Sequence, residues 1–151
     1  MANIGLIGTG TIGSGVIKIL KKNSDLIRKR AGVEINLKKV CDVKLENAKK
    51  LGIGKENLTT DYNDILNDKE IDIVVELIGG YEPAKTIILK AMQKGKHVVS
   101  ANKAVIAKFG PELFEAAQKN KVNFYFEAAV GGCIPILNAL QGNYQAERIN
   151  A

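Results

Sequence analysis

Cysteine and histidine are scarce in this chain of 151 residues, which holds two cysteines and one histidine. Cys41 and Cys133 stand far apart, without a CxxC pair or a histidine at metal-ligand spacing. The sequence therefore predicts neither a disulfide framework nor a zinc site. It also lacks an apolar run of about 18 residues and a basic leader followed by a cleavage site. These absences favour a soluble, cytoplasmic protein with reduced thiols and no membrane partner.

Aromatic residues make up only 5% of the chain, and no basic stripe accompanies them, although the net charge is +6. The lysines are scattered along the sequence, which is typical of a solvated surface and not of a nucleic-acid partner. The hydrophobic content of 46% is enough for one ordinary core. We expect one domain that spans residues 1–151.

Apolar runs of strand length alternate with helical patterns along the chain. The strands are expected at 4–7, 35–43, 71–80, 97–101 and 122–128, and the helices at 11–31, 46–51, 62–66, 83–94, 111–120 and from 135. This alternation predicts an α/β fold of the Rossmann type, doubly wound, with a mainly parallel sheet and helices on both faces. Residues 146–151 resemble the start of another strand without a partner. We therefore expect an N-terminal domain of something larger.

A glycine pattern lies between the first strand and the first helix. Gly8, Gly10 and Gly13 form GxGxxG, with Thr11 and Ile12 at the start of the helix. In this context the first glycine permits a tight turn, the second a close pyrophosphate, and the third close packing of helix and strand. The amides of the first helical turn then face the phosphates. The pattern predicts a dinucleotide site, with a plain glycine-rich turn as the alternative.

Asp42 lies at the end of the second expected strand and is the candidate acceptor for an adenosine ribose 2′-hydroxyl. It lies 29 residues after Gly13 (42 − 13), against about 20 in the usual fingerprint, which indicates a longer helix in between. An acidic side chain there favours NAD over NADP, although three nearby lysines keep NADP open: Lys44, Lys49 and Lys50. A solvated loop aspartate is the alternative.

Other candidates follow the later strands, because ligands of open parallel sheets bind beyond the carboxyl ends of the strands. Gly79 and Gly80 allow close approach to a cofactor, or simply form a tight turn. Lys103 is a cation and proton donor suited to a substrate oxygen during hydride transfer, unless it is an ordinary surface lysine. His97 starts a strand, at the wrong edge for catalysis, and is expected to be structural.

Three motifs give the chain a family resemblance: VVELIGG at 74–80, GKHVVSANKA at 95–104 and FEAAVGGCIPI at 126–136. Together with the glycine pattern they resemble the N-terminal domain of homoserine dehydrogenase. The resemblance implies interconversion of L-homoserine and L-aspartate 4-semialdehyde with NAD or NADP, on the route to threonine, methionine and isoleucine. It also implies a second domain for substrate binding and dimerisation, absent from this chain. We expect the chain to bind NAD(H) with negligible turnover and the longer enzyme to be a homodimer.

Site roles follow from the same resemblance. Residues 8–13, Ser100 and Asn102 correspond to cofactor contacts, and Lys103 to a lysine with a catalytic role near the nicotinamide. A monovalent cation such as sodium is implied on the main-chain carbonyls of Glu127, Val130, Gly132 and Ile134. Cys133 stands where the family mostly has glycine.

Two other functions stay open at this point. Glucose-fructose oxidoreductase-like dehydrogenases also place a lysine after a GKHV-type strand, although glutamate and proline usually flank it, where this chain has Asn102 and Ala104. A redox-sensing or regulatory module that binds NAD(H) without chemistry is the other alternative.

Overall fold

The computed structural model of the chain describes residues 1–132 and 134–143. Its strands are β1 (Ala2–Ile7), β2 (Ile35–Cys41), β3 (Leu58–Thr59), β4 (Ile73–Glu76), β5 (His97–Ser100) and β6 (Phe124–Tyr125). Its α-helices are α1 (Thr11–Lys22), α2 (Ser24–Ala31), α3 (Glu46–Lys50), α4 (Asn63–Leu66), α5 (Ala84–Gln93), α6 (Lys103–Asn120), α7 (Glu127–Val130) and α8 (Ile136–Asn143), and a short 3₁₀ helix covers Lys55–Asn57.

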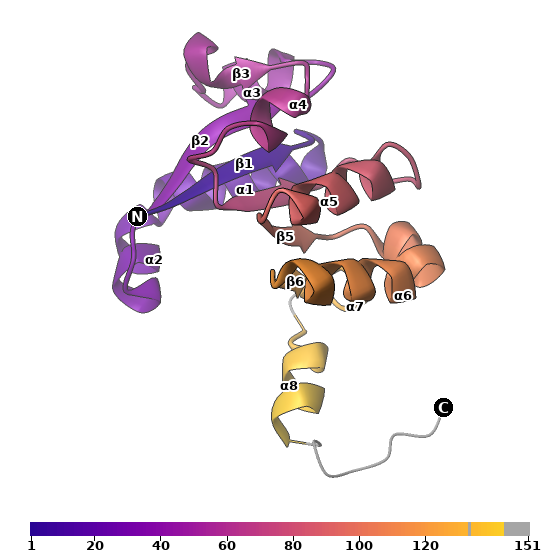
Figure 1. The fold of residues 1–151 in the computed structure, drawn as a ribbon. Coiled ribbons are helices and arrows are strands. Elements are labelled where there is room, and N and C mark those ends of the chain that lie inside the picture. The colour runs from indigo at the N-terminus through magenta and orange to yellow at the C-terminus, as the bar shows by residue number, and fades with distance from the viewer. Residues whose placement is uncertain (133, 144–151) are drawn as a thin grey trace.

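Within the described residues the strands form a single parallel sheet in the order β3-β2-β1-β4-β5-β6 (Figure 1). From β1 the chain adds β2 and β3 on one side of the sheet, and it then crosses to the other side of β1 and adds β4, β5 and β6. The sheet thus consists of two halves that meet between β1 and β4. This is the doubly wound order of a dinucleotide-binding fold. The predicted Rossmann-type α/β fold is confirmed.

The core has one layer on each face of the sheet, because successive strand residues point to opposite sides. On one face, buried residues of β1, β4 and β5 pack against α4, α5 and α6. On the other face, Leu6, Val40 and Val75 pack with Ile17 of α1 and Ala48 of α3. Burial on both faces explains why β4 is an almost continuous apolar run.

The strand register aligns four strand ends in one row. Ile7 pairs with Cys41 on one side and with Glu76 on the other, and Glu76 pairs with Ser100. The loops that follow these residues therefore begin at the same level, along the carboxyl edge of the sheet. This alignment brings together the segments in which the sequence places its cofactor contacts.

The helix expected over 11–31 is two helices in the structure. α1 ends at Lys22, Asn23 leaves the helical conformation, and α2 continues to Ala31 before Gly32, whose φ is +68°. Asparagine is a common helix-ending residue, and every side chain of α2 is exposed or partly exposed, so little packing opposes the break. The eight residues of α2 account for most of the extra spacing between Gly13 and Asp42.

The helix expected at 111–120 begins eight residues earlier, at Lys103. The Asn102 side chain accepts a hydrogen bond from the Val105 N–H and caps this start. Pro111 lies inside the helix, and the apolar stripe continues through it at i, i+4 spacing. The stripe consists of Val105, Phe109, Leu113 and Ala117. Packing of this stripe outweighs the helix-breaking tendency of Pro111, which had suggested a helix start.

The last expected strand, 122–128, is shorter than predicted, since α7 begins at Glu127 directly after β6. α8 projects away from the sheet beyond α7 (Figure 1). The strand expected at 146–151 lies outside the described residues. None of the helices in the described part of the chain is long and apolar enough to cross a membrane.

Candidate functional site

The glycine loop, residues 8–13, joins the end of β1 to the start of α1. Gly8 has a φ of +101°, which only glycine adopts readily, and its N–H donates to the Cys41 carbonyl at 2.9 Å. A Cβ on Gly13 would lie 1.9 Å from the Gly8 carbonyl oxygen. These two glycines are therefore required by the fold itself, for the turn and for the packing of α1 against it.

Gly10 differs from its two neighbours in the motif. Its φ of −64° suits any L-residue, and a Cβ built there meets no atom of the described residues within 4 Å. No contact in the described protein therefore requires glycine at this position. The open space faces the start of α1, where a ligand would need it.

The first turn of α1 presents main-chain N–H groups without a side-chain cap in the described structure, and Gly10 is the N-cap residue. Thr11 and Ile12, at the start of this turn, are exposed. The first turn of α1 holds no acidic residue, so the positive end of the helix dipole there can receive an anion. The glycine loop is thus shaped for a phosphate group.

Asp42 directly follows β2 and lies beside the glycine loop. One carboxylate oxygen accepts hydrogen bonds from the Thr9 N–H and from the Thr9 hydroxyl, the latter at 2.7 Å, and the other accepts from the Lys44 N–H at 3.0 Å. Partial burial opposes ionisation of Asp42, but the bonds from Lys44 and Thr9 outweigh it and lower the pKa of the carboxyl below its ordinary value. A fixed negative charge therefore stands at the end of β2.

A pocket of about 280 Å³ opens at the carboxyl edge of the sheet. We call it the carboxyl-edge pocket. It lies between the loops after β1, β4 and β5, and its lining residues are Thr11, Ile12, Leu77, Ile78, Gly79, Ala101 and Asn102. Four predicted cofactor contacts thus share one cavity. Gly79 and Gly80 both have positive φ, so the loop after β4 needs glycine at these positions.

Ser100 and Asn102 are more internal than the prediction implies. The Ser100 hydroxyl is buried, donates to Glu76 Oε2 at 2.7 Å and accepts from the Asn102 N–H at 3.0 Å. The Asn102 side chain donates to the Gly80 carbonyl at 2.8 Å. Both side chains therefore hold loops together in this structure, and their contact with a cofactor stays a prediction.

Sequence reasoning missed Glu76, which was hidden in an apolar run. Its carboxylate is fully buried at the end of β4, behind the carboxyl-edge pocket. The residue type could have identified Glu76 in the sequence. A lone acidic residue in a strand buried on both faces is unusual and needs hydrogen-bond partners.

Lys103 is exposed and begins α6, directly after Asn102 of the carboxyl-edge pocket. Its N–H donates to the Ala101 carbonyl at 3.2 Å. Lys103 thus stands at a capped helix start, next to a residue that lines the pocket. Its catalytic role stays a prediction.

The residues expected to hold a cation lie elsewhere. Glu127 lines a separate pocket of about 150 Å³ with aromatic neighbours, and its side chain accepts from the Leu137 and Asn138 N–H groups at 2.8 and 3.1 Å. The carbonyls of Glu127 and Ile134 accept main-chain bonds from Gly131 and Ile136. These contacts give Glu127 a capping role for α8 and leave the cation a prediction.

The remaining side chains that could ligate a metal or act as a nucleophile are spread over the described part of the chain. Across residues 1–132 and 134–143, no three His, Cys, Asp or Glu side chains form a group that suits a metal ion. Cys41 is a buried free thiol, whereas Cys133 lies outside the described residues. His97 accepts a hydrogen bond from the Asn123 N–H at 2.9 Å, in keeping with its expected structural role.

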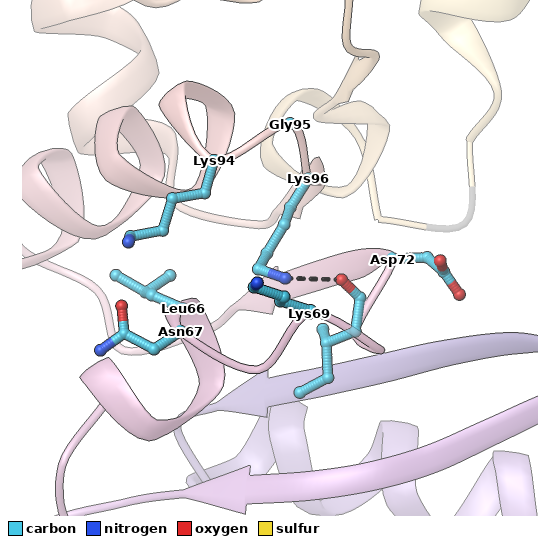
Figure 2. Close-up of a pocket in the computed structure, with 8 residues that line it drawn as sticks. Leu66, Asn67, Lys69, Asp72, Lys94, Gly95 and Lys96 are labelled. Atoms are coloured by element: carbon cyan, nitrogen blue, oxygen red, sulfur yellow. Dashed lines mark hydrogen bonds between the residues drawn. The ribbon is translucent and has the colours of Figure 1, made fainter.

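A larger pocket, of about 370 Å³, lies at the opposite, amino edge of the sheet (Figure 2). Lys96 is only 4% exposed there and donates to the carbonyls of Asp68 and Ile71 at 2.6 and 2.7 Å. Burial lowers the pKa of Lys96. Its bonds tie the loop before β4 to the start of β5, so we assign Lys96 to the fold and not to the site.

Comparison with known proteins decides the family. The family model described as "Homoserine dehydrogenase, NAD binding domain" matches residues 8–127. The chain belongs to this family. Homoserine dehydrogenase of Bacillus subtilis is 41% identical over 146 residues, which are 97% of this chain and 34% of that protein. The family match favours the homoserine dehydrogenase resemblance over the glucose-fructose oxidoreductase alternative.

Solved structures agree with the family. The crystal structure of a homoserine dehydrogenase from Thiobacillus denitrificans superposes with a TM-score of 0.90 at 47% identity, over 98% of this chain and 34% of that one. A hyperthermophilic archaeal homoserine dehydrogenase in complex with NADPH gives a TM-score of 0.74 at 25% identity, over 92% of this chain and 47% of that one. The chain thus spans about a third of the length of the bacterial relatives named here.

Proposed function

We propose that this chain binds NAD(H) with its pyrophosphate on the glycine loop and its nicotinamide in the carboxyl-edge pocket. The observation that carries the proposal is Gly10, where a side chain would meet only open space at the uncapped start of α1. Within the described protein, a larger residue fits there. Because Gly10 is the N-cap residue of α1, its missing side chain leaves room for a ligand that approaches the backbone closely at the helix start.

We further propose a preference for NAD over NADP. The lowered pKa of Asp42 keeps its carboxylate charged at neutral pH, and its position at the end of β2 suits a hydrogen bond from a ribose 2′-hydroxyl. The same charge repels a 2′-phosphate. The NADPH complex of the archaeal relative supports binding of this cofactor class, and the preference within the class rests on Asp42 alone.

Calorimetric titration of the chain with NAD and with NADP tests both proposals. Gly10→Ala should weaken NAD binding about tenfold or more, because a methyl group enters the phosphate path. Gly15→Ala is the matched control, since a Cβ on Gly15 also meets no described atom within 4 Å but lies farther along α1. Unchanged affinity in Gly10→Ala would refute the loop assignment. Tighter binding of NADP would refute the role of Asp42.

For a polypeptide that joins this domain to the remaining length of its relatives, we propose the homoserine dehydrogenase reaction. The bound nicotinamide supplies or accepts the hydride. Lys103, exposed at the mouth of the carboxyl-edge pocket, holds a proton near the substrate oxygen that gains or loses charge. The small-molecule substrate, L-homoserine or L-aspartate 4-semialdehyde, and a homodimer are part of this proposal. Residues 1–151 form its NAD(P)-binding domain and have negligible turnover alone.

A monovalent cation such as sodium remains a proposal that only the resemblance supports. Carbonyl oxygens are suitable ligands for such an ion, and each has a second lone pair beyond the bonds that Glu127 and Ile134 accept. Titration of NAD in sodium and in tetramethylammonium chloride at equal ionic strength tests for it, and equal affinities would refute a role in cofactor binding.

A further inference from the structure

Glu76 ends β4 with a fully buried carboxylate, and both of its oxygens are bonded. Oε1 accepts from the Ile78 N–H at 2.9 Å, and Oε2 accepts from the Ser100 hydroxyl at 2.7 Å. Removing a carboxylate from water is costly, and an apolar side chain would match the rest of the strand without that cost. The bonds made by Glu76 therefore indicate what the residue does.

From Glu76 the hydrogen bonds continue in a series, which we call the circuit. The Ser100 hydroxyl, which donates to Glu76, accepts from the Asn102 N–H at 3.0 Å. The Asn102 side chain then donates to the Gly80 carbonyl at 2.8 Å and accepts from the Val105 N–H at 3.2 Å. The circuit thus links the loop after β4 to the loop after β5 and to the start of α6.

The two linked loops form two walls of the carboxyl-edge pocket, and Thr11 and Ile12 of α1 line its remaining side. Leu77, Ile78 and Gly79 line it from the β4 side, and Ala101 and Asn102 line it from the β5 side. Glu76 itself does not belong to the lining. A change at Glu76 would therefore alter the separation of the walls without removing a contact with the ligand.

We propose that Glu76 is a positioning residue that fixes the width of the nicotinamide pocket and the start of α6 through Ser100 and Asn102. The inference rests on the proposed function, because it assumes that the carboxyl-edge pocket holds the nicotinamide. The glycine loop and Asp42, which would hold the rest of the cofactor, make none of these bonds. Loss of the circuit should consequently weaken binding of the nicotinamide half of the cofactor and leave binding of the ADP-ribose half unchanged.

The test compares two ligands on the 151-residue chain by calorimetry: NADH, and ADP-ribose, which lacks the nicotinamide. Glu76→Gln keeps the size of the side chain but leaves one acceptor for two donors, so the Ser100 hydroxyl or the Ile78 N–H loses its partner. We expect about tenfold weaker NADH binding and an ADP-ribose affinity within about twofold of the original. Glu70→Gln, an exposed site before β4 with the same charge change, is the control and should alter neither affinity.

A purely structural role of Glu76 would leave the ratio of the two affinities unchanged, because destabilisation of the fold affects both ligands alike. An unchanged ratio in a folded Glu76→Gln variant therefore overturns the inference while the proposed function stands. If the wild-type chain binds neither ligand, the proposed function fails instead. Equal wild-type affinities for NADH and ADP-ribose also overturn the inference, since the pocket then contributes nothing.

Hydrogen exchange of the wild-type chain gives a second measurement that needs no variant. NADH should slow exchange at the Ile78 and Asn102 amides, which donate to Glu76 and Ser100, more than ADP-ribose does. Equal protection of these amides by both ligands would contradict the inference. This measurement decides the question even if Glu76→Gln does not fold.

Discussion

Two glycines of α1 allow the same substitution to be tested with opposite expected results. A Cβ on Gly13 would lie 1.9 Å from the carbonyl oxygen and 2.9 Å from the carbonyl carbon of Gly8, whereas a Cβ on Gly15 meets no described atom within 4 Å. Both residues are inside the same helix, two positions apart. Gly13→Ala and Gly15→Ala therefore share their effect on the helix and differ in the clash with the β1–α1 loop.

The size of the difference follows from these contacts. Alanine in place of glycine stabilises a helix interior by about 1 kcal/mol, and this gain is common to both variants. In Gly13→Ala, main-chain atoms must move by about 1 Å to relieve the contact, and such overpacking costs about 1–3 kcal/mol. The atoms belong to the backbone of a tight turn, so they yield less easily than a side chain. Gly13→Ala should therefore be less stable than Gly15→Ala by about 1–3 kcal/mol.

Urea unfolding followed by circular dichroism measures the difference directly, and the chain has no tryptophan to follow instead. Gly15→Ala should move the midpoint to higher urea than the wild type, and Gly13→Ala should fall below Gly15→Ala. For a domain of this size, each kcal/mol corresponds to about 2–4 °C in Tm, which provides an independent check. Gly13→Ala with a stability equal to or above that of Gly15→Ala would refute the packing argument.

Three further predictions concern single side chains. The pKa of Asp42 is lowered in the folded chain, so its ionised carboxylate contributes to the free energy of unfolding. This contribution is complete above the ordinary pKa of 3.8 and is lost as the pH falls through the folded-state pKa. In Asp42→Asn, the midpoint of urea unfolding should therefore fall less at acidic pH than it does in the wild type. Identical pH profiles of the midpoint in the two proteins would contradict the prediction. Burial, followed by the charge of Asp42, raises the pKa of Cys41 to about 12, so in a Cys133→Ser background Cys41 should react with a thiol reagent only when urea opens the fold. Rapid labelling of the folded chain would contradict this. Lys103→Ala in the longer enzyme should lower kcat about 10²–10⁴-fold with an unchanged cofactor Kd, and equal turnover would exclude Lys103 from the reaction.

The fold could be predicted because its determinants are local. The run ending in Glu76 reads as a buried strand, Gly8 and Gly13 mark the turn into α1, and Gly32 marks the end of α2, where its φ is positive. Each of these patterns depends on a few consecutive residues. The position of Asp42 at the end of β2 follows from the same strand pattern.

The errors arose where packing, the lack of packing, or a distant partner decided the outcome. Pro111 suggested a helix start, but the cap at Asn102 and the apolar stripe of α6 extend the helix back to Lys103. Asn23 ends α1 inside an apparently continuous helical pattern. Glu76 was overlooked because its partner, Ser100, is 24 residues away. Pairings at such distances depend on strand register, which a single sequence does not reveal.

At the carboxyl edge of the sheet, side chains and main-chain groups have different roles. Thr9, Glu76 and Ser100 are all buried, and each has hydrogen-bond partners within the chain: Asp42 for Thr9, and Glu76 and Ser100 for one another. The groups directed toward the open space are instead the N–H groups at the start of α1. Buried polar side chains therefore fix the loops, and in the proposed function these loops present the backbone to the cofactor. Substitution of a buried polar side chain should change affinity through geometry, whereas a side chain at Gly10 should block the ligand outright.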